Sequence, residues 1–317
     1  MIERVTVTTG SRLHFGPLAV RPTTGREFGG IGLMVDAPRC RVTVSRSETD
    51  EVIASTESAR VAGWLQRYRN ATRQAAAGRR IELSESIPRH SGFGSGTQTA
   101  LAVATGLALL DGEANVASDE LARRLGRGRR SAVGIHGFEQ GGFLVDAGKR
   151  ERDAVGELTC RMGFPEGWRF VLITPGSGTS MTGQSEQTAF ERLSPMQAAR
   201  TDRLCGIVVR EILPALRAAD LEAFNLGVEA YGRIVGEYFA AAQGGVFADK
   251  RGERLAAAGV RGVVQTSWGP TLCVCRQDVD SATTLSESLQ GDREWRDCGV
   301  RVVRGMNCGA EANARRR

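Results

Sequence analysis

The sequence predicts an α+β protein of two domains, and three observations support that expectation. The chain has 317 residues, a length at which a single hydrophobic core usually gives way to two. Alternating apolar residues over 2–9 indicate a strand, whereas apolar residues at helical spacing over 59–77 indicate a helix. The charged stretch 149–167, which contains glycine and proline, separates two halves that each mix such patterns. We therefore expect one domain over 1–155 and a second over 156–317.

The remaining elements are predicted from the same periodicities and from helix start signals. Ser194 followed by Pro195 predicts a helix start, because serine caps helices and proline is tolerated at the first helical position. Ser118, followed by two acidic residues, predicts another. Further strands are expected at 39–46, 81–83, 143–148, 168–175, within 261–275 and at 299–305, and further helices after residue 98, over 219–240 and over 279–290.

Composition excludes several functional classes. Hydrophobic residues make up 41% and charged residues 25% of the chain, which is ordinary for a globular protein and unlike a disordered one. No apolar run approaches the roughly 20 residues of a membrane helix. The N-terminus lacks the basic and then apolar pattern of a signal peptide, so we expect a cytoplasmic protein with no membrane partner.

Charge and cysteine usage narrow the choice of partners. The net charge is +6, but no dense basic block occurs apart from Arg123–Arg130 and the terminal ARRR, so we expect small anionic substrates and no nucleic acid. The seven cysteines are scattered without a C-x-x-C pair, which favours free thiols over a zinc site. No metal ligand is assigned from the sequence.

The strongest local signal is a glycine-serine loop between a predicted strand and an apolar helix. Closely spaced backbone N–H groups and hydroxyls at the start of a helix suit a phosphate or pyrophosphate. The loop is neither a Walker A loop nor a dinucleotide-binding turn, and a purely structural strand-to-helix turn is the alternative. The candidate residues are Gly92, Gly94, Ser95, Gly96, Thr97 and Gln98.

The three histidines of the chain all lie beside glycine-rich segments. His14, His90 and His136 are therefore candidates for acid–base chemistry or anion contact, with packing as the alternative for each. Arginines lie beside the same loops, and their planar guanidinium groups bind phosphate and carboxylate. Arg12 and Arg26 are candidates for such contacts, although surface exposure would also explain them.

Several stretches together resemble a known family. The segments SRLHFG, GREFGGIGLMVD, GFGSGTQ, RSAVGIHGFEQGGFLVD and QTSWGPT resemble the GHMP kinase superfamily and, within it, the β-ribofuranosylaminobenzene 5′-phosphate synthase family. The resemblance implies an N-terminal ribosomal-protein-S5-like domain with a phosphate loop and a C-terminal ferredoxin-like domain.

The sequence departs from the kinases of that superfamily at two places. His136 stands where the kinases place an aspartate, and Gln265–Pro270 replaces their glycine-rich third motif. Both changes argue against ordinary phosphoryl transfer. An ATP-dependent small-molecule kinase and a catalytically inactive ligand-binding protein remain the alternatives.

The resemblance also implies a reaction and its participants. The family joins 4-aminobenzoate to phosphoribosyl pyrophosphate with loss of CO2 and pyrophosphate in methanopterin biosynthesis. We expect Mg²⁺ to take part, no pyridoxal phosphate or pyruvoyl group, and a homodimer. The candidate catalytic residues are His136, His90 and Glu139, and the candidate substrate-binding residues outside the loop are Arg12, His14, Arg26, Arg130, Ser131, Ser267 and the ring-stacking Trp268.

Overall fold

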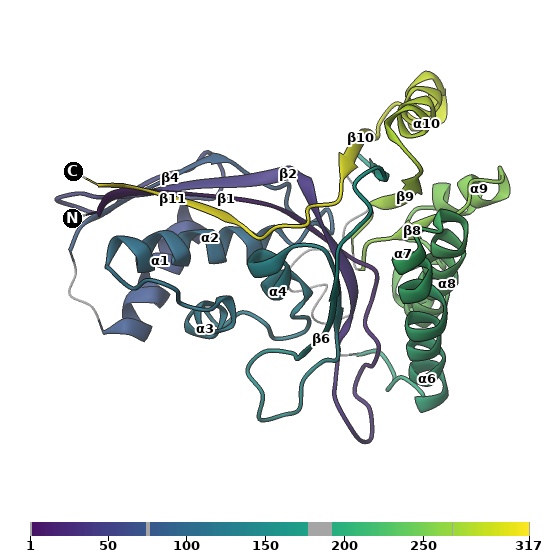
Figure 1. The fold of residues 1–317 in the computed structure, drawn as a ribbon, viewed down its shortest axis with the longest axis horizontal. Coiled ribbons are helices and arrows are strands. Elements are labelled where there is room, and N and C mark those ends of the chain that lie inside the picture. Colours follow the sequence, from purple (N-terminus) through teal and green to yellow (C-terminus); the bar gives the residue numbers. More distant parts are fainter. Residues whose placement is uncertain (1, 74–76, 177–191, 268, 317) are drawn as a thin grey trace.

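A large, mostly antiparallel sheet, in which only β3 and β4 pair in parallel, forms the first half of the described molecule. The computed structural model describes residues 2–73, 77–176, 192–267 and 269–316. Within these residues the sheet has the strand order β11-β1-β2-β4-β3, and β5 pairs with both β2 and β6 (Figure 1). The strands are β1 (Ile2–His14), β2 (Gly30–Arg46), β3 (Glu51–Ile53), β4 (Arg79–Glu85), β5 (Phe143–Asp146), β6 (Leu158–Met162) and β11 (Glu311–Arg316).

Helices cover one face of this sheet. They are α1 (Ser58–Thr72), α2 (Ser95–Leu110), α3 (Ser118–Arg124) and α4 (Val133–Gln140), and they lie below the sheet in Figure 1. The α2 helix is almost wholly buried, as its apolar sequence predicts. It lies directly on β2 because Gly106 has no side chain: a Cβ there would lie 2.6 Å from Cγ2 of Val44.

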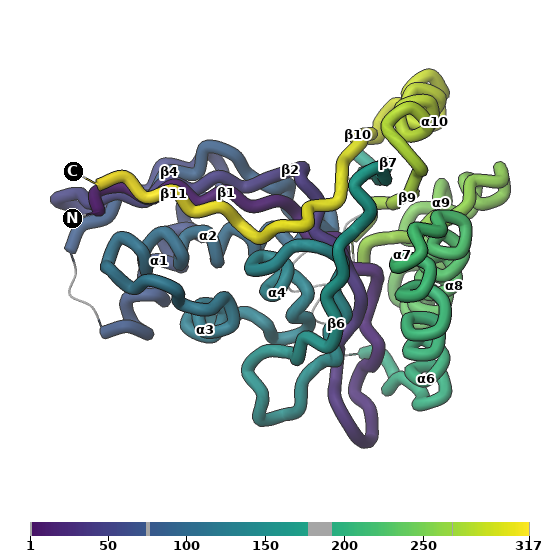
Figure 2. Tube along the Cα trace, in the orientation of Figure 1, coloured from purple at the N-terminus to yellow at the C-terminus, as the bar shows by residue number. Residues whose placement is uncertain are grey.

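The second half combines a smaller sheet with a group of helices. The sheet has the order β10-β7-β9-β8, and the helices stand beside it at the right of Figure 1, as the chain trace in Figure 2 also shows. The strands are β7 (Arg169–Thr174), β8 (Val264–Gln265), β9 (Leu272–Arg276) and β10 (Gly299–Arg304). The helices are α6 (Ala198–Ile207), the π-helix η1 (Val208–Ile212), α7 (Leu213–Ala218), α8 (Leu221–Gln243), α9 (Arg251–Ala257), α10 (Val279–Gly291) and the short 3-10 helix η2 (Arg293–Trp295).

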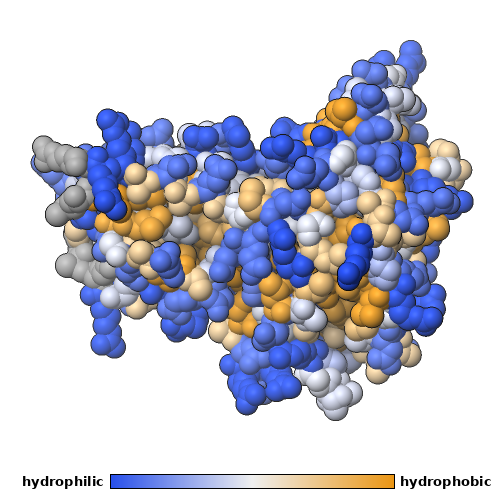
Figure 3. Space-filling view, in the orientation of Figure 1, coloured by the Kyte–Doolittle hydropathy of each residue, from blue (hydrophilic) through white to orange (hydrophobic). Residues whose placement is uncertain are grey.

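One hydrophobic core continues across the two halves. The ring of Phe224 on α8 lies 6.1 Å from that of Phe143 on β5 and 5.8 Å from that of Phe164. Figure 3 shows hydrophilic side chains over much of the viewed face, with apolar patches between them. Among the described residues, no helix is long and apolar enough to cross a membrane.

The sheet pairing crosses the predicted division at residues 155/156. The chain stays in the first sheet until β6, which pairs with β5, and it returns to that sheet at its end, where β11 pairs with β1. Every residue of β11 is exposed, so the strand has no apolar alternation by which the sequence could reveal it. The ARRR tail, interpreted as a basic segment, belongs largely to this strand.

Two predicted element boundaries were wrong for identifiable reasons. The helix expected at Ser194 begins instead at Ala198. The intervening segment is fixed by tertiary contacts, because the N–H of Met196 donates to the carbonyl of Val20 and the carbonyl of Ser194 accepts from the Tyr238 hydroxyl. The β2 strand starts at Gly30 rather than near residue 39, because its glycine-rich first part pairs with β1 and β5.

Candidate active site

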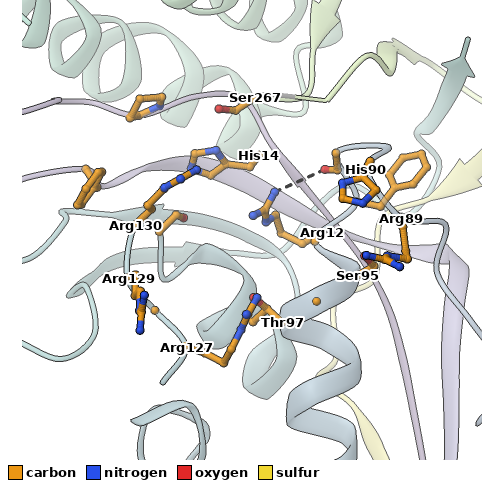
Figure 4. Close-up of a pocket in the computed structure, with 18 of the residues that line it drawn as sticks. Arg12, His14, Arg89, His90, Ser95, Thr97, Arg127, Arg129, Arg130 and Ser267 are labelled. Atoms are coloured by element: carbon orange, nitrogen blue, oxygen red, sulfur yellow. Dashed lines mark hydrogen bonds between the residues drawn. The ribbon is translucent and has the colours of Figure 1, made fainter. Parts of the chain in front are cut away.

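A cavity of about 620 Å³ opens where the end of β1, the start of α2 and the loop before α4 meet (Figure 4). Its lining is strongly cationic. The described residues that line it include no aspartate or glutamate, and the lining arginines are Arg12, Arg60, Arg67, Arg89, Arg127, Arg129 and Arg130. Glu57 pairs with two of these arginines, Arg60 at 3.0 Å and Arg89 at 3.2 Å, and the cationic excess of the lining is complementary to a polyanionic ligand.

The glycine loop forms one wall of this cavity, as the sequence predicts. Gly92 and Gly94 have φ angles of +81° and +70°, in the left-handed region that favours glycine, and the turn between them directs the chain into α2 at Ser95. Arg12 supports the loop from β1, because its N–H donates to the carbonyl of Phe93 at 3.0 Å and its Nη1 donates to that of Gly92 at 3.5 Å (Figure 4). The loop therefore brings the positive end of the α2 dipole to the cavity.

A cluster of arginines surrounds this helix start. We use "arginine end" for the part of the cavity lined by Arg60, Arg67, Arg127 and Arg129. Nη2 of Arg127 donates to the Thr97 hydroxyl at 3.2 Å. Burial, and after it the charges of Arg60, Arg67 and Arg129, lower the pKa of Arg127 to about 10. The repulsion among these cations would be relieved by a bound anion.

Gly96 leaves the space into which two of these guanidinium groups project. A Cβ at this position would meet Nη2 of Arg60 and would lie 2.9 Å from Nη2 of Arg127. Its φ angle is helical, so an alanine would fit the backbone and would favour the helix by about 1 kcal/mol.

We expect Gly96→Ala to weaken pyrophosphate binding by about tenfold or more while the melting temperature stays the same or rises. The arginines must move to admit the methyl group, and the fold need not. Calorimetric titration with pyrophosphate and thermal melts of both proteins measure the two effects. Unchanged pyrophosphate affinity in the folded variant would remove the loop from the anion site.

Two of the three histidines line the cavity. His14 lies at the end of β1 and is buried, and burial together with the charge of Arg12 lowers its pKa to about 3, against a smaller raising effect of a hydrogen bond with the Gly29 backbone. At neutral pH the His14 ring is therefore uncharged, and it cannot attract an anion by charge as a protonated imidazolium would. His90 is exposed on the opposite rim beside Arg89, which pairs with Glu57 at 3.2 Å.

The other candidate catalytic residues lie outside the cavity. His136 is on α4, and its Nε2 is 2.8 Å from the carbonyl oxygen of Gly156. Glu139 accepts a hydrogen bond from the N–H of Ser118 at 3.2 Å, which fixes the start of α3. The structure therefore does not bring either residue to the anion site. The placement of His136 was inferred from its position in a motif, which does not fix the direction of its side chain.

Two candidate binding residues also have structural partners elsewhere. Arg26 donates to the carbonyl of Gly148 at 3.1 Å and pairs with Asp153 at 3.3 Å, and so joins two loops outside the lining. Gln98 is buried, where it accepts from the Thr9 hydroxyl at 2.9 Å and donates to the carbonyl of Gly134 at 2.7 Å. Neither lines the cavity.

The remaining candidates divide between the lining and the undescribed residues. Arg12, Arg130, Ser131 and Ser267 line the cavity with Gly92, Gly94, Ser95, Gly96 and Thr97. Trp268 lies outside the described residues. The residues predicted from the sequence did not include the lining arginines Arg60, Arg67, Arg89, Arg127 and Arg129.

One sequence signal could have revealed some of the missing arginines. Arg60 and Arg67 lie two turns apart on α1 and therefore share a helix face. Arg127 belongs to the basic run Arg123–Arg130, which is separated from the glycine loop by the α2 helix and gives no local sign of contact with it. The guanidinium carbon of Arg60 lies 5.0 Å from the ring centre of Trp64, a contact that helps to hold this side chain.

The described lining does not fit a magnesium ion held by the protein. Magnesium sites in proteins use one or two carboxylates together with substrate phosphates, and this lining has none. No cluster of three or more histidine, cysteine or acidic side chains suited to a metal occurs among the described residues. Mg²⁺ would therefore enter only as part of a metal–pyrophosphate substrate.

Comparison with known proteins places this fold in a class. Residues 59–143 match the family model of the GHMP kinases N terminal domain. The structure superposes on a homoserine kinase from Cytophaga hutchinsonii with a TM-score of 0.66 at 17% identity, over 99% of this chain and 98% of that one. It superposes on a mevalonate diphosphate decarboxylase from Enterococcus faecalis with a TM-score of 0.66 at 12% identity, over 99% and 100%. The chain thus has the GHMP kinase fold, and the α+β prediction is confirmed.

Sequence similarity points to particular members of this class. The chain is 29% identical to a β-ribofuranosylphenol 5′-phosphate synthase from Methanothermobacter thermautotrophicus, over 86% of this chain and 88% of that protein. Proteins of the same name from Archaeoglobus fulgidus and Methanocaldococcus jannaschii are 28% and 26% identical, over 68% and 69% of this chain and 72% and 74% of theirs. The predicted resemblance to the ribofuranosyl 5′-phosphate synthases is confirmed.

Proposed function

We propose that the protein is a decarboxylating phosphoribosyltransferase that joins a para-substituted benzoate to C1 of phosphoribosyl pyrophosphate. The observation that carries the proposal is a cavity lined by seven arginines and no carboxylate, formed around the start of a buried helix. Phosphoribosyl pyrophosphate and a benzoate together bring a 5-phosphate, a pyrophosphate and a carboxylate. The similarity to proteins named as ribofuranosylphenol 5′-phosphate synthases supports the same reaction class.

The chemistry requires the site to stabilise a departing pyrophosphate. The bond from ribose C1 to the pyrophosphate oxygen breaks, and the ring carbon that bears the carboxylate forms a bond to C1. The carbon–carboxylate bond then breaks, CO2 leaves, and its electron pair restores the aromatic ring. Arg127 with its neighbours and the α2 dipole are the groups of this chain that would stabilise the growing negative charge.

Two para substituents of the benzoate acceptor, an amino group and a hydroxyl group, are compatible with the proposed reaction. Both an amino and a hydroxyl group donate electrons to the attacking ring carbon, and the printed name of the relatives refers to a phenol. The resemblance implies that the product would serve methanopterin biosynthesis, and the homodimer stays a prediction.

Product analysis tests this function against its nearest alternative. We expect incubation with phosphoribosyl pyrophosphate and 4-hydroxybenzoate or 4-aminobenzoate to give a C-riboside 5′-phosphate, identified by its mass and by the carbon–carbon bond in NMR spectra. An ATP-dependent kinase has the same fold, but such enzymes hold Mg²⁺ and orient the acceptor hydroxyl with carboxylates that this lining lacks. Turnover of ATP with a small-molecule alcohol, and no C-riboside, would favour the kinase.

A further inference from the structure

A buried glutamate outside the cavity lining contacts two of the arginines that belong to it. Glu57 is only 6% exposed. Its Oε2 accepts a hydrogen bond from Nη1 of Arg60 at 3.0 Å, and its Oε1 lies 3.2 Å from Nε of Arg89. Burying a carboxylate costs free energy unless charged partners and hydrogen bonds replace the lost water. These two arginines therefore supply the partners that allow Glu57 to be buried.

The local structure at Glu57 does not require a glutamate side chain. Glu57 is the N-cap residue of α1, and its backbone carbonyl accepts from the N–H groups of Arg60 and Val61 at 3.0 and 2.9 Å. Serine, threonine, aspartate and asparagine are the side chains preferred for capping at this position. The Glu57 side chain makes no capping hydrogen bond and is bonded to Arg60 instead. Its charge still favours the start of α1, so a test of any other role must hold that contribution constant.

The two contacts of Glu57 differ in how firmly they are made. The contact with Arg60 is a hydrogen bond of ordinary length, and the guanidinium carbon of Arg60 also lies 5.0 Å from the ring centre of Trp64. The contact with Arg89 is an ion pair only, because Oε1 of Glu57 has no hydrogen-bond partner among the described residues. The side chain of Arg89 is also 50% exposed. Glu57 therefore constrains Arg60 more than Arg89.

Arg60 places its second terminal nitrogen at the start of α2. A Cβ on Gly96 would meet Nη2 of Arg60 and would lie 2.9 Å from Nη2 of Arg127, so both nitrogens lie beside this helix start. The guanidinium group is planar and rigid. Because its Nη1 is bonded to Glu57 and its central carbon lies over the Trp64 ring, the direction of Nη2 is constrained as well. A donor that is already in place loses less conformational entropy when an anion binds.

We propose that Glu57 is a positioning residue, which holds Nη1 of Arg60 so that Nη2 is directed at the anion bound at the start of α2. This inference rests on the proposed function for the identity of that anion, the pyrophosphate group of phosphoribosyl pyrophosphate. Glu57 does not line the cavity and therefore acts through Arg60. Its negative charge opposes anion binding, whereas its hydrogen bond to Arg60 favours it. Glutamine separates the two effects, because it keeps an acceptor oxygen and loses the charge.

A pair of variants that lose the same charge tests this role. Glu57→Gln and Glu57→Met both remove the carboxylate, but only glutamine can still accept from Arg60. We expect Glu57→Gln to bind pyrophosphate about tenfold more tightly than Glu57→Met in calorimetric titrations. In an Arg60→Met background the two should bind pyrophosphate equally, because no guanidinium group remains to be held. The values of kcat/KM for phosphoribosyl pyrophosphate should follow the same pattern.

A second buried carboxylate provides the matched control. Asp111 pairs with Arg79 at the other end of α2, where both side chains are nearly buried and neither lines the cavity. Asp111→Asn and Asp111→Leu should bind pyrophosphate with equal affinity, although both lose a buried ion pair. Thermal melts of all variants establish folding, and Glu57→Ala replaces a Glu57→Met protein that does not fold.

The outcomes separate this inference from the proposed function. Equal binding of pyrophosphate to the two Glu57 variants, or a tenfold difference that persists without Arg60, overturns the inference even if a C-riboside forms. A difference that depends on Arg60, in a protein that forms no C-riboside, supports the positioning role and refutes the proposed reaction. Absence of pyrophosphate binding to the wild-type protein overturns both.

Discussion

Replacing Arg127 with methionine is expected to lower kcat/KM for phosphoribosyl pyrophosphate by about 10²- to 10³-fold without loss of folding stability. The guanidinium bonds to Thr97 at the start of α2 and has Arg60, Arg67 and Arg129 as its charged neighbours. Removing one positioned donor from a developing anion typically costs about 2.7–4 kcal/mol of transition-state stabilisation. Removing a partly buried cation from among like charges should change the free energy of unfolding little. Methionine also keeps most of the apolar part of the arginine side chain.

Arg123→Met provides the matched control for this prediction. Arg123 is an exposed arginine on α3, its Nε and Nη2 each lie 2.8 Å from an oxygen of Glu120, and it does not line the cavity. Steady-state kinetics with varied phosphoribosyl pyrophosphate, calorimetry with pyrophosphate and urea unfolding should be measured on both variants. Equal activity in the two folded variants would show that the arginine end does not serve the pyrophosphate.

Acidification is expected to destabilise the protein through His14. The folded-state pKa of about 3 lies below the unfolded value of 6.5, so the unfolded chain takes up the proton first as the pH falls. Stability that is fully present above the unfolded pKa is therefore lost progressively between pH 6.5 and pH 3. Between about pH 7 and about pH 5 the loss from this one group is about 2 kcal/mol.

Comparison with His14→Gln isolates this contribution, because glutamine does not titrate. Urea unfolding at both pH values should show that the wild-type protein loses about 2 kcal/mol more stability than the variant on acidification. Carboxylates elsewhere titrate in both proteins and cancel in the difference. If the two proteins lost stability in parallel, His14 would not be held neutral in the fold.

Sequence patterns predicted the parts of the fold whose conformation is determined by residues close together in the sequence. The apolar run that became α2 and the glycines before it are encoded within one short segment, and the turn that they form needs positive φ angles at Gly92 and Gly94. The β11 strand could not be anticipated, because it is exposed throughout and its partner, β1, lies at the other end of the chain. Backbone pairing over such a separation leaves no periodic signal.

The same distinction applies to the candidate site: residues in local motifs were predicted, and residues brought there only by tertiary packing were not. His14, Arg12 and the loop were identified because they stand in or beside glycine-rich motifs, and these motifs meet at the cavity. Arg60 and Arg67 come from α1, and only the packing of the helices brings them to the start of α2. Conversely, His136 is within a glycine-rich motif, yet its ring bonds to Gly156 outside the lining. A motif fixes the neighbourhood of a residue more reliably than the direction of its side chain.

Release of labelled CO2 tests the central claim most directly. The protein is incubated with phosphoribosyl pyrophosphate, Mg²⁺ and 4-hydroxybenzoate or 4-aminobenzoate labelled in the carboxyl carbon, and CO2 and pyrophosphate are both quantified. We expect the two products to appear in equal amounts, to depend on phosphoribosyl pyrophosphate, and to fall together in Arg127→Met. Pyrophosphate release with retention of the carboxyl label, or no release of either from the folded protein, would contradict decarboxylating C-riboside formation.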